Sequence, residues 1–236
     1  MKKGIQNLKK VFDLAPVSLK ASALLSYSRY NTIVELIARQ NGFSGRTAAG
    51  VFSALSPNND YLGNLRDTNT LLKAAKRGAD LDDFKVSTFG ANKRKAWGIA
   101  NGHDPMDVLL APKTRNFFVN VHDPKNTGHV TIDGHMHNIW IGDREPLQIR
   151  KLNHRLYDEI AWDTREAAFE MQVIPCQFQA VVWQQWRLMH NIKSSPQLLF
   201  WDDDLFSSGL GFQKWCDVLD SHQRPSPCQG GTLLLS

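Results

Sequence analysis

The 236-residue chain lacks the features that mark several large classes of protein. Its three cysteines, Cys176, Cys216 and Cys228, form no CxxC pair, so neither a disulfide scaffold nor a four-cysteine metal site is supported, and a reducing compartment fits best. No segment approaches the roughly 20 consecutive apolar residues of a membrane span. The N-terminal residues also lack the apolar stretch and cleavage site of a signal peptide. We therefore expect a cytoplasmic protein that does not enter a membrane.

The composition of the chain fits a globular protein with a partner of negative charge. Hydrophobic residues make up 42% of the sequence, which is enough for a substantial core in a chain of this length. The 28 basic residues exceed the 23 acidic ones and give a net charge of +5. A mild basic excess of this kind attracts polyanions, so nucleic acid is a reasonable partner class.

The hydrophobic pattern predicts helices, because alternating runs of Val, Ile and Thr are scarce and apolar residues recur at helical spacing. Gly42, Gly78 and Gly102 are typical of residues that end helices, and Pro112 and Pro175 are typical of first-turn positions. We therefore expect an all-α fold with helices over residues 31–40, 47–55, 64–77, 92–101, 113–121, 155–173 and 175–190.

The segment from Val130 to Gly142 (VTIDGHMHNIWIG) is unusual because Asp133 follows an apolar residue and precedes Gly134. This position suits the N-cap of a helix that begins at His135, where free main-chain N–H groups favour an ionised carboxylate. By itself, the pattern indicates no more than a capping residue.

Four segments follow one another along the chain: Leu55-Ser56-Pro57-Asn58, Phe89 to Ala96 (FGANKRKA), Ala111-Pro112-Lys113-Thr114-Arg115 and Ile132-Asp133-Gly134-His135. Lys113 and Asp133 are separated by about one helix and one loop. In the order and spacing of these segments, the region from Asn31 to His190 resembles the helix-hairpin-helix DNA glycosylase superfamily. The glycine-rich hairpin of that superfamily is shortened here to Leu110-Ala111-Pro112, and Pro112 lacks a main-chain donor.

The resemblance implies two helical subdomains with a cleft between them, over residues 1–193, and a C-terminal extension at 194–236 that packs on or covers this domain. It also implies an enzyme that flips a damaged or modified base out of double-stranded DNA and cleaves its N-glycosidic bond. Asp133 would stabilise positive charge on the sugar. Lys113 would be a nucleophile that adds a lyase step. We expect no cofactor, because the cysteine quartet of the iron–sulfur members is absent, and we expect a monomer.

The resemblance further assigns contacts with DNA. Asn58 and Asn59 would fill the gap left by the flipped base, although both are also ordinary turn residues. The remaining expected DNA contacts are Lys93, Arg94, Lys95, Thr114, Arg115 and His135. The three consecutive basic residues fit a solvated helix face equally well, and Lys113 alone fits a solvated lysine or a phosphate contact.

The sequence does not select the base. Bacterial members of the superfamily include repair enzymes and antiviral enzymes that remove hypermodified (glucosylated hydroxymethyl) cytosine from phage DNA. Aromatic residues that could stack on a flipped base are numerous, although we expect most of them in the core. They are Trp97, Phe117, Phe118, Trp140, Trp183 and Trp186.

Two other functions remain open at this stage. A metal-dependent nuclease or hydrolase could use the cluster of His122, His129, His135 and His137, although no HExxH or paired-carboxylate pattern accompanies it. A non-catalytic DNA-binding module would keep the basic surface without needing Lys113 and Asp133.

Overall fold

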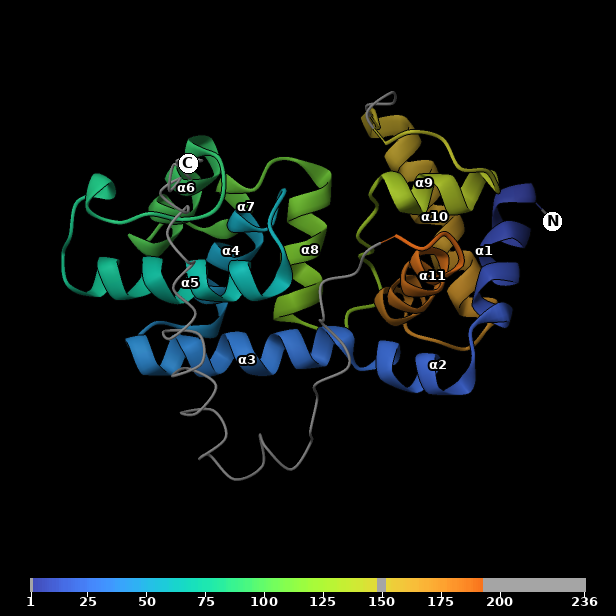
Figure 1. Ribbon diagram of the computed structural model, residues 1–236, viewed down its shortest axis with the longest axis horizontal. Helices are drawn as coiled ribbons and strands as arrows, with labels where there is room; N and C mark the ends of the chain where they lie inside the picture. The colour runs from blue at the N-terminus through green and yellow to red at the C-terminus, as the bar shows by residue number, and fades with distance from the viewer. Residues whose placement is uncertain (1, 148–151, 193–236) are drawn as a thin grey trace, which may run out of the picture. The chain divides into compact units, whose positions relative to one another are not determined.

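The computed structural model describes residues 2–147 and 152–192 (Figure 1). Within these ranges the regular structure is helical and includes no β-strand, which confirms the predicted all-α fold. The expected extension at residues 194–236 lies outside the described residues. The helices are α1 (Lys3–Leu14), α2 (Val17–Leu24), α3 (Ser26–Asn41), α4 (Gly45–Leu55), α5 (Tyr61–Lys76), the short 3-10 helix η1 (Leu81–Asp83), α6 (Gly90–Ala100), α7 (Pro105–Val108), α8 (Pro112–His122), α9 (Gly134–Ile141), α10 (His154–Glu170) and α11 (Pro175–Met189).

Several helix ends follow the predicted signals. Gly42 ends α3 with a φ of 76°, and Gly78 follows α5 with a φ of 65°. Such left-handed values favour glycine because it has no Cβ. Pro112 and Pro175 are the first residues of α8 and α11, where a missing main-chain N–H costs no hydrogen bond.

Two predicted helix starts were wrong, because the helices expected to begin at residues 31 and 64 begin earlier, at Ser26 and Tyr61. Asn31 lies within α3, and its side chain donates to a main-chain carbonyl at the end of α8 at 3.2 Å. Asn64 lies within α5 and donates to the carbonyl of Phe52 at 3.0 Å. The cap of α5 is Asp60, whose carboxylate accepts the N–H of Gly63 at 2.8 Å.

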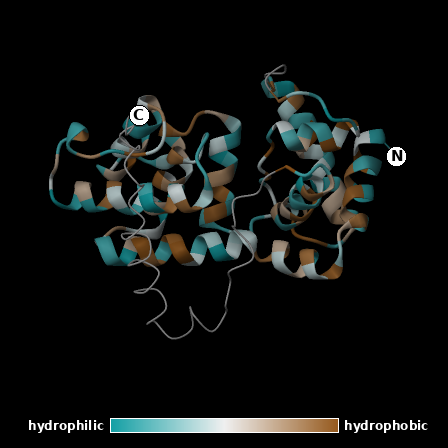
Figure 2. Ribbon diagram, viewed as in Figure 1, coloured by the Kyte–Doolittle hydropathy of each residue, from teal (hydrophilic) through white to brown (hydrophobic). Residues whose placement is uncertain are grey.

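The N-terminal residues, for which no helix was predicted, form α1 and α2. Ile5, Leu8, Val11 and Phe12 are buried on one face of α1, at the i, i+3 and i+4 spacing of an amphipathic helix. Interspersed lysines hid this pattern in the sequence. Figure 2 shows polar and apolar residues interspersed along the helices.

The helices from α3 to α8 form one group, which we call the α4 group. α4 packs against α3, α5, α6 and α8, and every residue from Ala48 to Leu55 is buried. Ser44 caps this helix, because its hydroxyl accepts the N–H of Thr47 at 3.0 Å. The predicted apolar helix is thus the central element of the group.

The remaining helices, α1, α2, α9, α10 and α11, form what we call the α11 group. α1 packs against α9, α10 and α11, and α2 packs against α11. Their shared core includes Leu8, Met136, Ile160 and Phe178. α3 also contacts α11, and Tyr27 donates to Gln179 at 2.8 Å across this contact. In the described part of the chain, no helix is long and apolar enough to cross a membrane.

Candidate functional site

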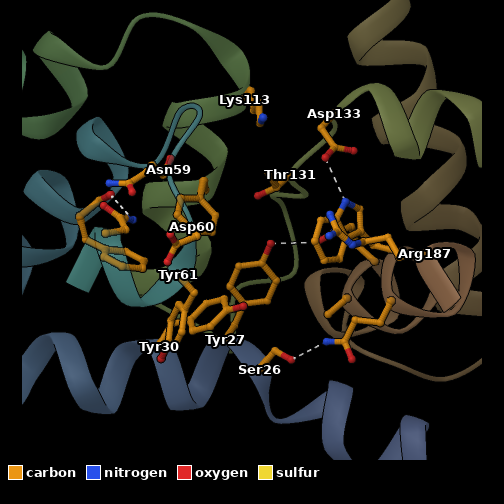
Figure 3. A pocket seen from close by; sticks show the side chains of 18 of the residues that line it. Ser26, Tyr27, Tyr30, Asn59, Asp60, Tyr61, Lys113, Thr131, Asp133 and Arg187 are labelled. Atoms are coloured by element: carbon orange, nitrogen blue, oxygen red, sulfur yellow. Dashed lines mark hydrogen bonds between the residues drawn. The ribbon is translucent and has the colours of Figure 1, made fainter. Parts of the chain in front are cut away.

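The two predicted catalytic residues line the same pocket, which has a volume of about 470 Å³. Lys113 comes from α8 in the α4 group, and Asp133 precedes α9 in the α11 group. Asn58 and Asn59 also line this pocket. Figure 3 shows Lys113 and Asp133 toward one end of the pocket, with Ser26, Tyr27 and Tyr30 toward the other. Residues from distant parts of the sequence therefore meet at one cavity.

Asp133 is the N-cap of α9, and both of its carboxylate oxygens accept hydrogen bonds. Oδ1 accepts the main-chain N–H of Met136 at 3.0 Å, which is the predicted capping contact. Oδ2 accepts the indole N–H of Trp183, on α11, at 2.9 Å (Figure 3). These two contacts fix the half-buried carboxylate at the wall of the pocket.

Lys113 is the second residue of α8, and its side chain is exposed at the pocket. The hydroxyl of Thr114 donates to the carbonyl of Ala111 at 3.1 Å, a contact within the first turn of the helix. Arg115 is half-buried. Lys113 therefore has access to solvent, whereas Thr114 serves the helix itself.

One side of the pocket is lined by aromatic residues that we call the aromatic wall: Tyr27, Tyr30, Phe52, Tyr61 and Phe117. The ring centroids of Tyr30 and Tyr61 are 5.0 Å apart, and those of Phe52 and Phe117 are 5.7 Å apart. Burial raises the pKa of Tyr30 to about 12, and burial also raises the pKa of Tyr27 and Tyr61. The three hydroxyls are therefore uncharged at neutral pH.

The side of the pocket near Asp133 is more polar. The guanidinium of Arg187 lies 4.4 Å from the ring centre of Trp183. The rings of His135 and Trp183 meet edge to face, 6.0 Å apart. Burial lowers the pKa of His135, and the charge of Asp133 partly opposes this effect. His135 is therefore neutral at pH 7, so it is a poor candidate for holding a phosphate by charge.

The turn between α4 and α5 presents the two asparagines differently. Asn58 is exposed and has a φ of 58°, a left-handed value that asparagine tolerates better than most residues. The amide of Asn59 donates to Asp67 at 2.8 Å. Asp67 also accepts the N–H of Ser87 at 2.8 Å, which ties the turn to the segment before α6. Of the two asparagines, Asn58 is thus the one whose side chain is accessible to a bound molecule.

The three predicted basic contacts at the start of α6 also differ. Lys93 donates to the carbonyl of Phe84 at 2.5 Å and lies 4.2 Å from the centre of the Phe84 ring. Arg94 and Lys95 are exposed. Arg94 and Lys95 are therefore accessible from solvent, whereas Lys93 links the segment after η1 to α6.

The histidines proposed for a metal site have separate surroundings. His122 stacks on Phe118 at 5.7 Å, and His129 hydrogen bonds to Asn116 at 2.7 Å. His137 is buried beside Asn138. Across residues 2–147 and 152–192, no three His, Cys, Asp or Glu side chains form a group that could hold a metal ion.

Of the aromatic residues predicted to stack on a base, Phe117 and Trp183 line the pocket. Phe118 and Trp186 are buried in the core instead, and Trp140 donates to the buried Asp163 at 2.9 Å. Sequence reasoning missed the pocket residues of α3, Tyr27 and Tyr30, because aromatic residues at helical spacing indicate a core equally well. It also missed Arg187, which lines the pocket from α11.

Comparison with known proteins places this chain in one family. Residues 1–190 match the model of a family of unknown function (DUF7178), and the chain belongs to that family. No curated protein and no solved structure matches it.

Proposed function

We propose that this protein is a DNA glycosylase that flips a damaged or modified base into the pocket and cleaves its N-glycosidic bond. The observation that carries the proposal is that Lys113 and Asp133 line one cavity together with the aromatic wall. A pocket of about 470 Å³ is within the range for small-molecule sites. Tyr and Phe rings provide flat faces on which a base can stack.

The role proposed for Asp133 follows from the charge that develops as the bond breaks. When the base leaves with the bonding electrons, positive charge grows on the sugar. A carboxylate that is already fixed in position stabilises this charge without reorganising. The hydrogen bonds from Met136 and Trp183 supply that fixed position.

The role proposed for Lys113 is to form a covalent link to the sugar. Its amine adds to C1′ while the N-glycosidic bond breaks, and the departing base takes a proton from the nitrogen that has added. The C1′–O4′ bond then breaks as the nitrogen forms a double bond to C1′, and O4′ takes up a proton, which gives a Schiff base. Loss of a C2′ proton and of the 3′ phosphate would then cut the strand. The exposure of Lys113 leaves the amine accessible to DNA.

DNA would extend from the pocket to the start of α6. Arg94 and Lys95 lie near the N-terminus of α6, where the helix dipole disfavours positive side chains unless an anion is also present. Phosphates would supply that anion, and the first turn of α8 beside Lys113 offers a second such position. This arrangement would correspond to two helical subdomains, the α4 group and the α11 group, with DNA at the cleft between them, and a monomer would suffice.

The repair and antiviral alternatives differ only in the base that the pocket accepts. The direct test is a set of duplexes that contain oxidised, alkylated, deaminated and glucosylated hydroxymethyl bases, with strand cleavage measured with and without a chelator. We expect cleavage of one class, and the same rate with the chelator. Loss of cleavage with the chelator would support a metal-dependent nuclease. Binding without cleavage of any duplex would support a non-catalytic DNA-binding module.

The covalent step has its own test. Borohydride should trap the wild-type protein on substrate DNA, and Lys113→Ala should abolish this adduct. Lys125→Ala is the matched control, because Lys125 is also exposed but lies in the loop after α8 and does not line the pocket. Normal turnover by Lys113→Ala, with no trapped wild-type adduct, would instead indicate that Asp133 activates water in a monofunctional glycosylase.

A further inference from the structure

One buried hydroxyl joins the two chain segments that lead into Lys113 and Asp133. Tyr157 lies on α10, is 4% exposed and does not line the pocket. Its hydroxyl donates to the carbonyl of Val130 at 2.9 Å and accepts the N–H of Ile132 at 3.2 Å. The same hydroxyl also points to the carbonyl of Pro112 at 3.4 Å, so its one proton is shared between the carbonyls of Val130 and Pro112.

The main-chain groups held by this hydroxyl lie next to the proposed catalytic residues. Pro112 directly precedes Lys113, and Ile132 directly precedes Asp133. Val130 and Ile132 are buried, so their polar main-chain groups depend on a partner from the protein.

The hydroxyl of Tyr157 keeps its proton under all ordinary conditions. Burial raises the pKa of Tyr157 to about 12. Because the side chain is neutral and does not reach the pocket, it cannot act as the acid or base of the reaction. Its contribution is therefore geometric.

We propose that Tyr157 is a positioning residue that fixes the separation between the main chain that carries Lys113 and the main chain that carries Asp133. This inference rests on the proposed function of these two residues. α8 and the segment 129–132 are also joined by the pairs Asn116–His129 and Asn120–Thr131, at 2.7 and 3.0 Å. Those pairs join later turns of α8 to the segment 129–132. Tyr157 instead links the main chain before Lys113 and the main chain before Asp133 to α10.

The test uses a duplex with a single abasic site, because its C1′ aldehyde reacts with an amine whatever base the enzyme recognises. Tyr157→Phe removes the hydroxyl and keeps the ring. We expect the single-turnover rate of borohydride-trapped adduct to fall by roughly tenfold to a hundredfold, the cost of a small misplacement of reacting groups. The dissociation constant for the same DNA, from fluorescence anisotropy, should not change.

The matched control is Thr164→Val. Thr164 is fully buried on the same helix and donates to the carbonyl of Ile160 at 2.7 Å. Neither residue lines the pocket. This variant loses a buried hydroxyl and should trap at the wild-type rate. The loss in Tyr157→Phe should also be the same at all values between about pH 6 and about pH 9, since a positioning hydroxyl does not titrate there.

Three results would overturn the inference. The first is that Tyr157→Phe forms the trapped adduct as fast as wild type. The second is that Thr164→Val loses as much rate as Tyr157→Phe, which would show that the loss reflects general destabilisation. In wild type, rapid hydrogen exchange at the Ile132 amide would show that the hydroxyl does not hold this segment, and this measurement stands even if Tyr157→Phe fails to fold. If wild type traps no more than Lys113→Ala, the proposed role of Lys113 fails as well, and that outcome differs from a failure of Tyr157 alone.

Discussion

Replacing Asp133 by Asn tests the contact geometry of the site without any knowledge of the substrate. The carboxylate accepts two hydrogen bonds, one from Met136 and one from Trp183. An amide has one oxygen, so in Asp133→Asn an N–H group must face one of these two donors. The variant therefore loses one hydrogen bond to a charged acceptor, which is worth about 1.5–3 kcal/mol. For a chain of this size, each 1 kcal/mol corresponds to a melting temperature lower by roughly 2–4 °C.

The partner variant, Trp183→Phe, removes the indole donor from the other side of the same contact. In the double variant the amide of Asn at position 133 no longer faces the indole N–H, so the two losses should not add. We expect the double variant to be about 1 kcal/mol more stable than the sum of the single effects, within the range for residues in contact. Urea unfolding followed by circular dichroism measures this, because the chain has seven tryptophans and its fluorescence would change with the substitution itself.

The control cycle pairs Asp133→Asn with Thr164→Val. Thr164 bonds only within α10 and shares no hydrogen bond with Asp133. These two effects should add to within about 0.5 kcal/mol. If the Asp133 and Trp183 effects add equally well, the indole does not hold the carboxylate, and the argument for a pre-positioned charge at this site is refuted.

Three further predictions concern residues that are expected to contact DNA. The double variant Arg94→Ala, Lys95→Ala should weaken binding to any DNA sequence and reduce its salt dependence by roughly two counterions, whereas Lys93→Ala should mainly lower stability. Equal salt slopes for all variants would show that Arg94 and Lys95 do not contact phosphates. Because the pKa of His135 is lowered, the stability that it contributes is present above about pH 6.5 and is lost as the pH falls below that value. In His135→Gln the melting temperature should therefore fall less steeply as the pH is lowered, and an unchanged pH profile would contradict this. Asn58→Gly keeps the left-handed turn but removes the side chain, so it should slow base excision while leaving the melting temperature within about 2 °C of wild type; normal single-turnover rates would exclude the wedge role.

Most of the helices could be predicted from the sequence because their signals are local. The apolar run in α4, and the glycines and prolines at helix ends, each depend on neighbouring residues only. The starts of α3 and α5 could not be predicted in this way. Asn31 and Asn64 satisfy the same local rule as true caps, and their actual partners are carbonyls of other helices. Capping residues are ambiguous when a tertiary contact can use the same side chain.

In the candidate site, too, local signals could be predicted and tertiary contacts could not. The N-cap role of Asp133 could be predicted because its capping contact lies three residues away, and the start of α8 could be predicted because Pro112 marks it. The catalytic roles of Asp133 and Lys113 were expected only from the family resemblance. The distant residues that contact these two segments could not be predicted. Trp183 and Tyr157 contact the segments around Asp133 from 50 and 25 residues away in the chain. No periodicity or spacing records such contacts, because they depend on how α10 and α11 pack.

The contrast between the two proposed catalytic groups has a physical basis. A carboxylate that stabilises charge forms no bond, so its effect depends on being fixed before the reaction, and Asp133 is held through both oxygens. An amine that forms a bond is oriented by that bond, and the long side chain of Lys113 retains its rotamer freedom at an exposed position. DNA would therefore have to order Lys113 during binding, whereas the protein alone orders Asp133. The contacts agree with this proposal, because Trp183 bonds to the carboxylate and Tyr157 bonds to the main chain before each residue.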